Sequence, residues 1–344
     1  MDGATIYDIA QKAGVAPSTV SRALQDHPRI GAKTRQRIQS LADEMGYVPS
    51  AVARGLKTSR SHVIGVIVHR IEDPFLTEVL RGIEDTLQAS GYSLFLAASQ
   101  RDLKREEKAV QAMGENRVDG VIISSSDISS ERMHQLERYG IPSVLINNQT
   151  QQAPHTYSVY HDERYAMHQL LHHVIELGHE RIAYLGNTRG GRTNLQRRQG
   201  YEEALAQAGL KIRADYIVNG ENGMPQSGAQ SMRALLESAT ALIPTAVVCF
   251  NDMMALGAMQ AIRQAGLRVP DDLSLTGFDN VDLAAYFNPP LTTFHQPRYE
   301  LGLQAATMML QALNGEIGPA EQASCLRGEL IVRQSTGPHP AAPP

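Results

Sequence analysis

Polar side chains follow several apolar stretches that have the length and composition of β-strands. These side chains are Asp73, Ser124, Asn147, Asn251, Asp252 and Asp279, and the aromatic Phe75 comes two positions after Asp73. Carboxylates accept hydrogen bonds and amides both donate and accept them, so together they can bind neighbouring hydroxyl groups. This chemistry suits a sugar or a nucleoside, and the residue types alone do not separate the two.

The stretches that precede these residues predict two parallel sheets. Strands are predicted at residues 63–68, 93–97, 121–123, 143–146, 182–186, 216–218, 246–250 and 273–277, with amphipathic helical segments between them. This alternation indicates an α/β fold in which helices cover both faces of parallel sheets. Two halves of similar organisation predict two lobes. Ligands bind beyond the carboxyl ends of strands in such sheets, so the polar residues are expected to meet in one cleft.

The first sixty residues are organised differently. Apolar residues recur at helical spacing up to Ala13, Gly14 permits a turn with positive φ, and Pro17 suits the first position of a second helix. Two short helices joined by such a turn predict a helix-turn-helix, whose second helix lies in the major groove of DNA.

The charge distribution agrees with a DNA-binding first segment. The chain has a net charge of −4, but residues 1–60 hold nine Lys or Arg and five Asp or Glu, so this segment carries +4 and the rest −8. A basic head on an acidic body concentrates affinity for nucleic acid in the head.

The same segment resembles the DNA-binding headpiece of the LacI/GalR family of transcriptional regulators. Residues 5–24, TIYDIAQKAGVAPSTVSRAL, read much like the family pattern TIYDIAxxAGVSxxTVSRxL, and the likeness continues at residues 32–35, Leu41, 46–49 and 51–57. The resemblance implies a homodimeric, allosteric repressor that binds pseudo-palindromic double-stranded operator DNA. It also implies a periplasmic-binding-protein-like core that binds a small-molecule effector, most simply a sugar, between two lobes.

The resemblance assigns base reading to the second helix. It implies that Pro17, Ser18 and Arg22 face the bases, and an arginine can give two hydrogen bonds to guanine, worth about 1–3 kcal/mol of discrimination. Ala16 replaces the usual family serine and so removes a helix N-cap. The expected DNA contacts, most of them to phosphates, are completed by Thr5, Tyr7, Thr19, Ser21, Thr34, Ala53, Arg54, Leu56 and Lys57.

A short hinge helix is predicted where Pro49 and Ser50 precede the sequence AVARGLK. A helix of about two turns is marginal alone because nucleation is costly, so we expect it to fold only with DNA and a partner copy. In the family this helix lies in the minor groove and a leucine inserts between base pairs. Leu56 matches that leucine, and its insertion would kink the duplex.

The resemblance also sharpens the expected cleft. Arg197, three residues before Gly200, matches the effector-binding arginine of the family, with the adjacent Arg198 as a competitor. The pair Asn251-Asp252, the aspartate Asp279 and the aromatic Phe75 match further family positions. Asn147 stands where many relatives carry aspartate.

Other functional classes lack their signatures. The chain has no run of about eighteen apolar residues and no signal peptide, so we expect a cytoplasmic, nucleoid-associated protein without membrane contact. His168, His172 and His173 lack the rest of an HExxH metal motif, and residues 186–191 (GNTRGG) fit neither a dinucleotide nor a P-loop pattern. With no GxSxG motif and no Cys–His pairing either, we expect no enzyme, no cofactor and no metal.

The expected architecture is therefore an all-α headpiece followed by an α/β core. Its parts are a helix-turn-helix headpiece (1–49), a hinge (50–61), a two-lobed effector-binding and dimerisation domain (62–335) and a flexible Pro-rich tail (336–344). Three rival interpretations are a nucleobase- or nucleoside-responsive regulator of the same family, a solute-binding protein for transport, and a nucleotide-dependent enzyme.

Overall fold

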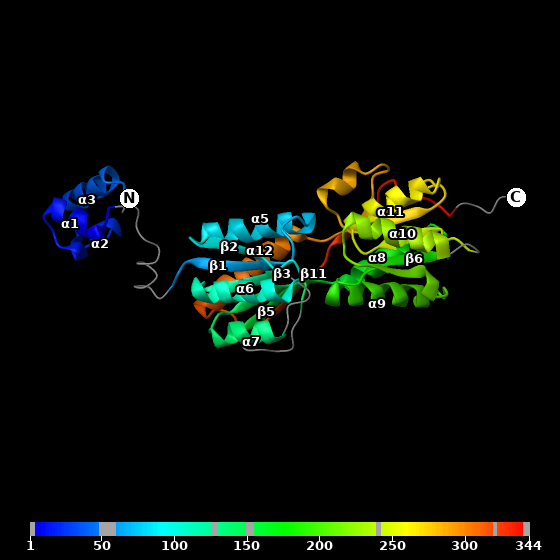
Figure 1. Cartoon of the computed structure of the whole chain (residues 1–344), viewed down its shortest axis with the longest axis horizontal. Coiled ribbons are helices and arrows are strands. Elements are labelled where there is room, and N and C mark those ends of the chain that lie inside the picture. The colour runs from blue at the N-terminus through cyan, green and yellow to red at the C-terminus, as the bar shows by residue number, and fades with distance from the viewer. Residues whose placement is uncertain are drawn as a thin grey trace. The chain divides into compact units, whose positions relative to one another are not determined.

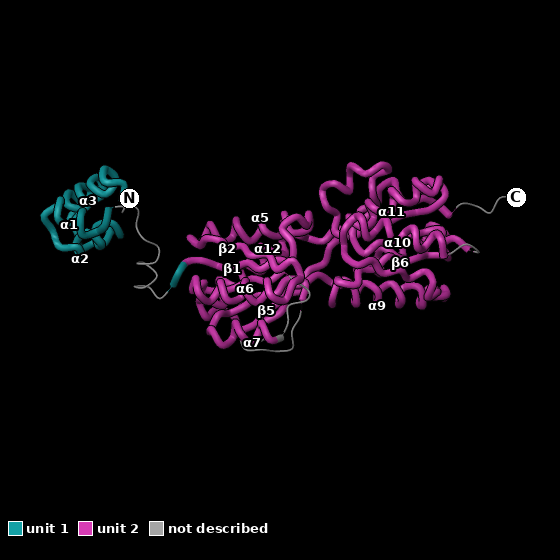
Figure 2. Tube along the Cα trace, viewed as in Figure 1, with its two compact units in different colours: residues 1–61 teal, residues 62–344 magenta. Residues whose placement is uncertain are grey.

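The computed structural model describes residues 4–47, 60–124, 130–148, 155–238, 242–318 and 322–339. The chain divides into two compact units, residues 1–61 and residues 62–344, which Figure 2 shows in different colours. We call them the headpiece and the body. None of the described helices is both long and apolar enough to cross a membrane.

The headpiece is a three-helix unit around a small apolar core. Its helices are α1 (Ile6–Ala13), α2 (Pro17–Leu24) and α3 (Ala32–Glu44), and the fully buried side chains of Ile9, Val20 and Ile38 join them. Gly14 ends α1 in the left-handed conformation and so forms the turn into α2. These helices confirm the predicted helix-turn-helix.

The two helices of that motif begin differently. The Thr5 side chain accepts a hydrogen bond from the Asp8 backbone N–H, and the Asp8 side chain accepts one from the Thr5 N–H, which makes a capping box. The N-cap of α2 is Ala16, whose methyl group cannot accept a hydrogen bond, as the sequence indicated. Pro17 occupies the first turn of α2, where a missing N–H costs nothing.

The first lobe of the body is a six-stranded parallel sheet in the order β11-β5-β4-β3-β1-β2. Helices α5 and α12 pack on one face and α6 and α7 on the other (Figure 1). Gly82 of α5 and Gly302 of α12 allow close helix contact, because a Cβ on either would overlap the other helix's backbone. The elements are β1 (Val63–Val68), α5 (Pro74–Ala89), β2 (Ser93–Ala98), α6 (Leu103–Glu115), β3 (Gly120–Ser124), α7 (Ser130–Arg138), β4 (Ser143–Ile146), β5 (Thr156–His161), α12 (Arg298–Asn314) and β11 (Ala323–Leu326).

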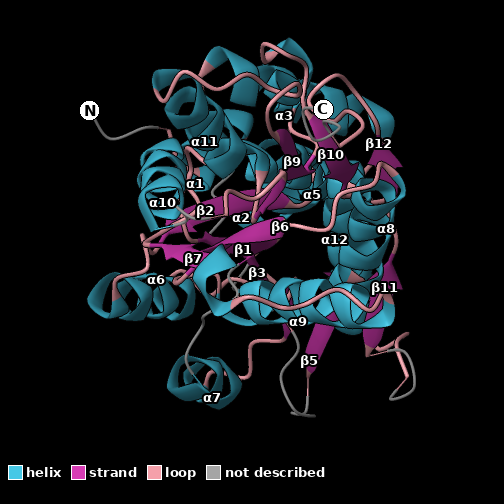
Figure 3. Ribbon diagram, turned by 90° about the vertical axis from the view of Figure 1, so that its right-hand side faces the viewer, coloured by secondary structure: helices cyan, strands magenta, loops and turns pink. Residues whose placement is uncertain are grey.

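The second lobe repeats this plan with the strand order β12-β10-β9-β8-β6-β7. Here α10 and α11 pack on one face and α8 and α9 on the other, and Figure 3 shows helices on both sides of the strands. Strand β12 is antiparallel to β10, while the other pairs are parallel. The elements are α8 (Glu163–Glu176), β6 (Ile182–Asn187), α9 (Gly191–Gln207), β7 (Ile217–Gly220), α10 (Pro225–Ser238), β8 (Ala246–Cys249), α11 (Asp252–Gln264), β9 (Ser274–Asp279), β10 (Thr292–His295) and β12 (Glu329–Ile331), with short 3₁₀ turns at Ala214–Tyr216 and Asp282–Tyr286.

The described chain passes between the lobes at three places. It crosses from β5 to α8, returns from β10 to α12, and crosses again between β11 and β12. The carboxyl ends of both parallel sheets therefore face one interlobe region, as the sequence predicted. Each predicted strand has a counterpart, but β5, β10, β11 and β12 were not predicted, because these short stretches mix polar residues with apolar ones.

The flexible tail predicted at residues 336–344 includes residues that are held by hydrogen bonds in the second lobe. The Thr336 hydroxyl lies 3.1 Å from His173 Nε2, the Gly337 carbonyl lies 3.0 Å from His179 Nε2, and the His339 N–H donates to the Leu177 carbonyl at 2.8 Å. Residues 336–339 are therefore part of the second lobe. Their hydrogen-bonding groups fix them there despite the nearby prolines, and residues 340–344 lie outside the described part.

Candidate functional site

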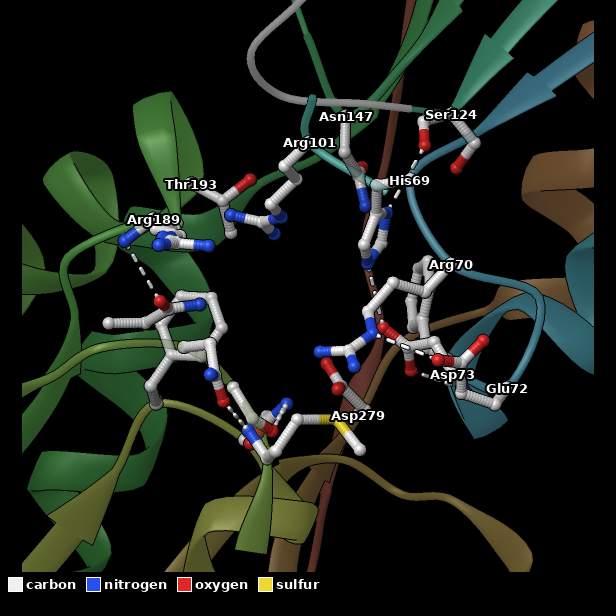
Figure 4. Close-up of a pocket in the computed structure, with 18 of the residues that line it drawn as sticks. His69, Arg70, Glu72, Asp73, Arg101, Ser124, Asn147, Arg189, Thr193 and Asp279 are labelled. Atoms are coloured by element: carbon white, nitrogen blue, oxygen red, sulfur yellow. Dashed lines mark hydrogen bonds and ion pairs between the residues drawn. The ribbon is translucent and has the colours of Figure 1, made fainter. Parts of the chain in front are cut away.

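A cavity of about 340 Å³ lies between the two lobes of the body, as Figure 4 shows. Most of its lining residues have polar or charged side chains, and they come from both lobes. The described residues that line it are His69, Arg70, Glu72, Asp73, Phe75, Gln100, Arg101, Ser124, Ile146 and Asn147 from the first lobe, and Asn187, Arg189, Gly190, Thr193, Arg197, Asn222, Gly223, Met224, Phe250, Asn251, Asp279 and Gln296 from the second lobe and its crossing.

Arg197 of α9 is held by a buried ion network. Its Nε donates to Glu163 Oε2 at 2.7 Å and its Nη2 donates to Glu163 Oε1 at 3.3 Å and to Asp279 Oδ1 at 3.5 Å. Its Nη1 donates to the Phe250 carbonyl. The guanidinium also stacks on the Phe278 ring at 3.7 Å. The predicted competitor Arg198 instead pairs with Glu202, so Arg197 is the arginine at the cleft.

Burial and charge act against one another in this network. Burial tends to raise the pKa of the Glu163 carboxyl, but Arg197 and His161 together outweigh burial and hold that pKa below its ordinary value. Burial raises the pKa of Asp279 well above its ordinary value, even though Arg197 is near. Removing one member of such a buried ion pair typically costs about 3–5 kcal/mol, so the network is part of the fold as well as of the cleft.

Two amides connect Asp279 to the first lobe. Gln296, in the second crossing, donates from Nε2 to Asp279 Oδ1 at 2.6 Å. Asn147, at the end of β4, donates from Nδ2 to Gln296 Oε1 at 3.3 Å and accepts the His161 N–H at 3.0 Å. Asn147 has a φ of 53°, a left-handed conformation that asparagine tolerates. The floor of the cleft therefore links residues of both lobes.

The first-lobe wall is centred on Asp73. Its Oδ1 accepts the Phe75 N–H at 3.0 Å and so caps α5, while its Oδ2 lies 3.0 Å from His69 Nε2. Burial tends to raise the pKa of Asp73, but the His69 hydrogen bond and charge outweigh it and lower that pKa. The phenyl ring of Phe75 and the buried Ser124 complete this wall.

Asn251 lines the cavity, but Asp252 does not. Asn251 Oδ1 accepts the Met254 N–H at 2.9 Å, which caps α11, and its Nδ2 donates to the Gly223 carbonyl at 3.1 Å. Asp252 is fully buried and accepts the Thr293 hydroxyl at 2.6 Å and the Val281 N–H at 2.8 Å. Its predicted place in the ligand site is therefore wrong, because its carboxylate joins α11 to β10 and to Val281, which follows β9. Burial raises the pKa of Asp252 to about 7.

Several residues that line the cavity were not predicted from the sequence, although some of them follow predicted strands. Arg101 follows β2, and Arg189 and Thr193 follow β6, so each lies after a strand that the sequence predicted. The glycine-rich segment GNTRGG contains Arg189 but fits no phosphate-loop pattern. Gln296 follows β10, which was itself missed. His69 comes one residue after β1, and no other feature of the sequence singles it out.

The structure describes most residues of the predicted DNA surface. Tyr7, Ser18, Arg22 and Thr34 are exposed, as is Thr5, while Pro17, Thr19 and Ser21 are half-buried beside the core of the motif. Because Arg22 and Ser18 lie on the outer face of α2, they are positioned as a reading helix requires. Ala53, Arg54, Leu56 and Lys57 lie outside the described residues. DNA contact by all of these residues stays a prediction.

The three neighbouring histidines of α8 have other partners. His168 lies 3.3 Å from Glu203, His172 lies 3.2 Å from Glu176, and His173 lies 3.1 Å from the Thr336 hydroxyl. Across the part of the chain that the structure describes, no three His, Cys, Asp or Glu side chains are grouped so as to hold a metal ion.

Comparisons with known proteins bear on both units. Residues 5–50 match the family described as "Bacterial regulatory proteins, lacI family", and residues 171–336 match "Periplasmic binding protein-like domain". The chain is 34% identical over 310 residues to the HTH-type transcriptional repressor PurR of Aliivibrio salmonicida (strain LFI1238), covering 90% of this chain and 92% of the relative. It is 34% identical over 334 residues to the HTH-type transcriptional repressor CytR of Escherichia coli (strain K12), covering 97% and 96%.

Solved structures extend the likeness to the whole chain. The lac repressor dimer bound to operator and the anti-inducer ONPF superposes with a TM-score of 0.87 at 27% identity and covers 98% of this chain and 100% of its own. A LacI family transcriptional regulator from Enterococcus faecium with bound ribose has a TM-score of 0.72 at 28% identity, and the match covers 80% of this chain and 99% of that one.

Proposed function

Because the chain belongs to the lacI family of bacterial regulatory proteins, we propose that a sugar bound between its lobes controls its affinity for operator DNA. The protein is a DNA-binding repressor with a ligand-binding core. A lobe arrangement that depends on the ligand would set the spacing of two hinge segments. Ligand and DNA would then affect each other's binding reciprocally, typically by about 1–3 kcal/mol.

The observation that carries the sugar proposal is the composition of the cleft. Asp73 and Asp279 present carboxylates from opposite lobes, and Asn147 and Gln296 add amides between them. Such groups bind hydroxyls in pairs. Phe75 supplies an aromatic surface against which the carbon face of a sugar ring can pack. The similar regulator with bound ribose adds support.

A nucleoside is the second candidate effector. Phe75 and Phe250 both line the cavity, and aromatic rings of this kind stack against planar bases as well as against sugars. The ribose of a nucleoside would use the same carboxylates and amides. Both candidates therefore predict loss of the ligand response in Asp279→Ala, and only ligand binding itself distinguishes them.

A screen of thermal stability tests the effector class. A ligand at 100 times its Kd stabilises the folded state by about 2.7 kcal/mol, which for a body of this size raises Tm by about 4–5 °C. The sugar proposal expects a rise with one or more of D-ribose, other pentoses, hexoses and sugar phosphates. A rise confined to nucleobases or nucleosides would replace the sugar proposal by its rival.

We further propose that the repressor acts as a homodimer in the cytoplasm, where its two headpieces bind a pseudo-palindromic operator. A hollow of about 490 Å³ between α10 and α11 is lined partly by Met224, Pro225, Ala229 and Met253. A second copy of the chain would bury these apolar groups, and the similar lac repressor is a dimer. Met253→Glu should then give monomers in sedimentation analysis, and an unchanged mass would exclude this surface.

The headpiece proposal rests on the exposed face of α2. Arg22→Ala should weaken binding to a selected operator and relax sequence preference at one base pair, by about 1–3 kcal/mol. Leu56→Ala should weaken operator binding far more than nonspecific binding, because the leucine is proposed to insert only at the operator. Equal losses for both kinds of DNA would remove the insertion from the mechanism.

A further inference from the structure

Like charges face each other across the cleft at two separate places. At the first, Asp73 of the first lobe and Asp279 of the second both line the cavity, and the Asp73 charge helps to raise the pKa of Asp279, after the larger effects of burial and of the Asp252 charge. Two carboxylates on opposite walls repel each other as the walls approach. Hydroxyl groups of a ligand can donate hydrogen bonds to both carboxylates and so offset their repulsion.

At the second place the facing groups are arginines. Arg101 comes from the turn between β2 and α6 in the first lobe, and Arg189 comes from the turn between β6 and α9 in the second. Figure 4 shows the Arg101 side chain reaching into the cavity on the side where Arg189 and Thr193 lie, away from Asp279. Two guanidinium groups on opposite walls also repel each other as the walls approach. A ligand group that binds between them must therefore be negatively charged.

The ion pair of Arg189 leaves this arginine able to bind an anion. Arg189 pairs with Glu221 at 2.8 Å, and the two side chains are 52% and 66% exposed. Such a surface pair is worth about 0–1 kcal/mol, so a better-placed anion can replace the glutamate. Arg101 interacts electrostatically with Asp73, which places its charge inside the cleft and not on the outer surface.

We propose that the effector is an acidic sugar: its hydroxyl groups bind between Asp73 and Asp279, and its phosphate or carboxylate group binds between Arg101 and Arg189. This inference rests on the sugar proposal above and narrows it. Arginine suits the acidic group because its planar fork of N–H donors matches the oxygens of phosphate and carboxylate. The Thr193 hydroxyl lies on the same wall as Arg189 and offers another donor.

The first experiment uses inorganic phosphate alone as the probe. Thermal stability of the full chain is compared in phosphate and in chloride at equal ionic strength, for the unaltered protein, Arg101→Gln, Arg189→Gln and the control Arg268→Gln. Arg268 is an exposed second-lobe arginine that pairs with Asp271 and Asp272 and does not line the cavity. We expect both cleft variants to lose a phosphate-dependent rise in Tm that the control retains. An equal rise in all four proteins would overturn the anion site.

The second experiment compares matched neutral and acidic sugars by calorimetry. D-ribose is compared with D-ribose 5-phosphate, and D-glucose with D-glucose 6-phosphate and D-gluconate, so that phosphate and carboxylate are distinguished. We expect an acidic member to bind about tenfold or more tightly, because charge-assisted hydrogen bonds are the strong ones. In Arg189→Gln this preference should shrink toward onefold.

The two proposals fail in different ways. Neutral sugars that bind as tightly as their acidic counterparts would overturn the anionic subsite and leave the sugar proposal standing. Phosphate binding that requires both arginines, with no response to any sugar, would keep the subsite and contradict the sugar proposal.

Discussion

The two lobes of the body have similar topologies but hold their cleft residues in different ways. Their strand orders are equivalent, and each sheet has helices on both faces. In the second lobe Arg197 and Glu163 form an ion pair whose side chains are each 3% exposed. In the first lobe the pair at the cleft wall, His69 and Asp73, lies at a helix cap with side chains 16% and 20% exposed.

This difference in burial predicts that the cleft residues of the two lobes tolerate substitution to different degrees. The buried Arg197–Glu163 pair must be complete before the second lobe is stable, so neither of its two groups can be exchanged without damage to the fold. A partly exposed cap can change with little structural cost. We therefore expect the second lobe to provide a fixed binding surface and the first lobe to accept substitutions that alter ligand preference.

The sharpest test of the contrast is Arg197→Met. This change leaves the Glu163 carboxylate buried without its cation, so the body should lose about 3–5 kcal/mol of unfolding free energy, measured by urea denaturation. The neighbouring Arg198→Met is the control, because Arg198 lies in a surface pair and should change stability by less than about 0.5 kcal/mol. Similar losses in the two variants would break the distinction between buried and exposed arginines.

A second substitution tests Asp252 as a structural residue. In Asp252→Ala the buried Thr293 hydroxyl and Val281 N–H lose their acceptor, which should cost about 1–3 kcal/mol. Ligands that bind the cleft should still bind the folded variant with unchanged Kd in calorimetry. A Kd raised more than tenfold in a variant that remains folded would return Asp252 to the ligand site.

The buried carboxyl groups also predict how stability depends on pH. Asp252 has a pKa of about 7 in the folded protein against an ordinary value of 3.8, so the folded state binds the extra proton between these values. Its contribution is therefore present below about pH 4 and is lost as pH rises toward 7, by at most about 1.4 kcal/mol per pH unit. The raised pKa of Asp279 acts in the same direction. Urea denaturation at several pH values should show that the unfolding free energy of Asp252→Asn falls less with rising pH than that of the unaltered protein. An identical fall in the two proteins would contradict the raised pKa of Asp252.

The smallest effect is expected in the first lobe. Asp73→Asn keeps an oxygen that can cap α5, so the cost should be below about 1 kcal/mol. Because the pKa of Asp73 is lowered in the folded protein, its carboxylate stabilises the fold at pH values above the ordinary pKa of aspartate. This stabilisation is lost as the pH falls through the folded pKa. Asp73→Asn should lack this loss of stability in acid. A destabilisation as large as that of Arg197→Met would remove the contrast between the lobes.

Much of the fold and part of the site followed from the sequence for identifiable reasons. Continuous apolar runs gave the central strands, and polar residues after them gave Asp73, Ser124, Asn147, Asn251 and Asp279 at the cavity. The prediction that Asp252 binds the ligand was wrong because this residue already lies in the first turn of α11, where it faces the sheet. Position in sequence does not reveal this direction.

Other parts of the site depend on contacts that no local pattern contains. Gln296 reaches the cleft because the chain crosses between the lobes there, after a strand of four residues that the pattern does not reveal. Arg197 lies inside a helix, so only the family resemblance singled it out. Its partner Glu163 lies 34 positions away and was not predicted.

Operator binding measured with and without a cleft ligand tests the central claim most directly. A duplex is selected from random-sequence DNA with the full chain, and its affinity is measured by fluorescence anisotropy as a stabilising sugar is added. We predict a change in operator affinity of about 5- to 150-fold, with nonspecific DNA unaffected, and loss of the ligand response in Asp279→Ala although this variant still binds the operator. An operator affinity that stays constant while the sugar saturates the cleft would contradict control of the repressor by this site.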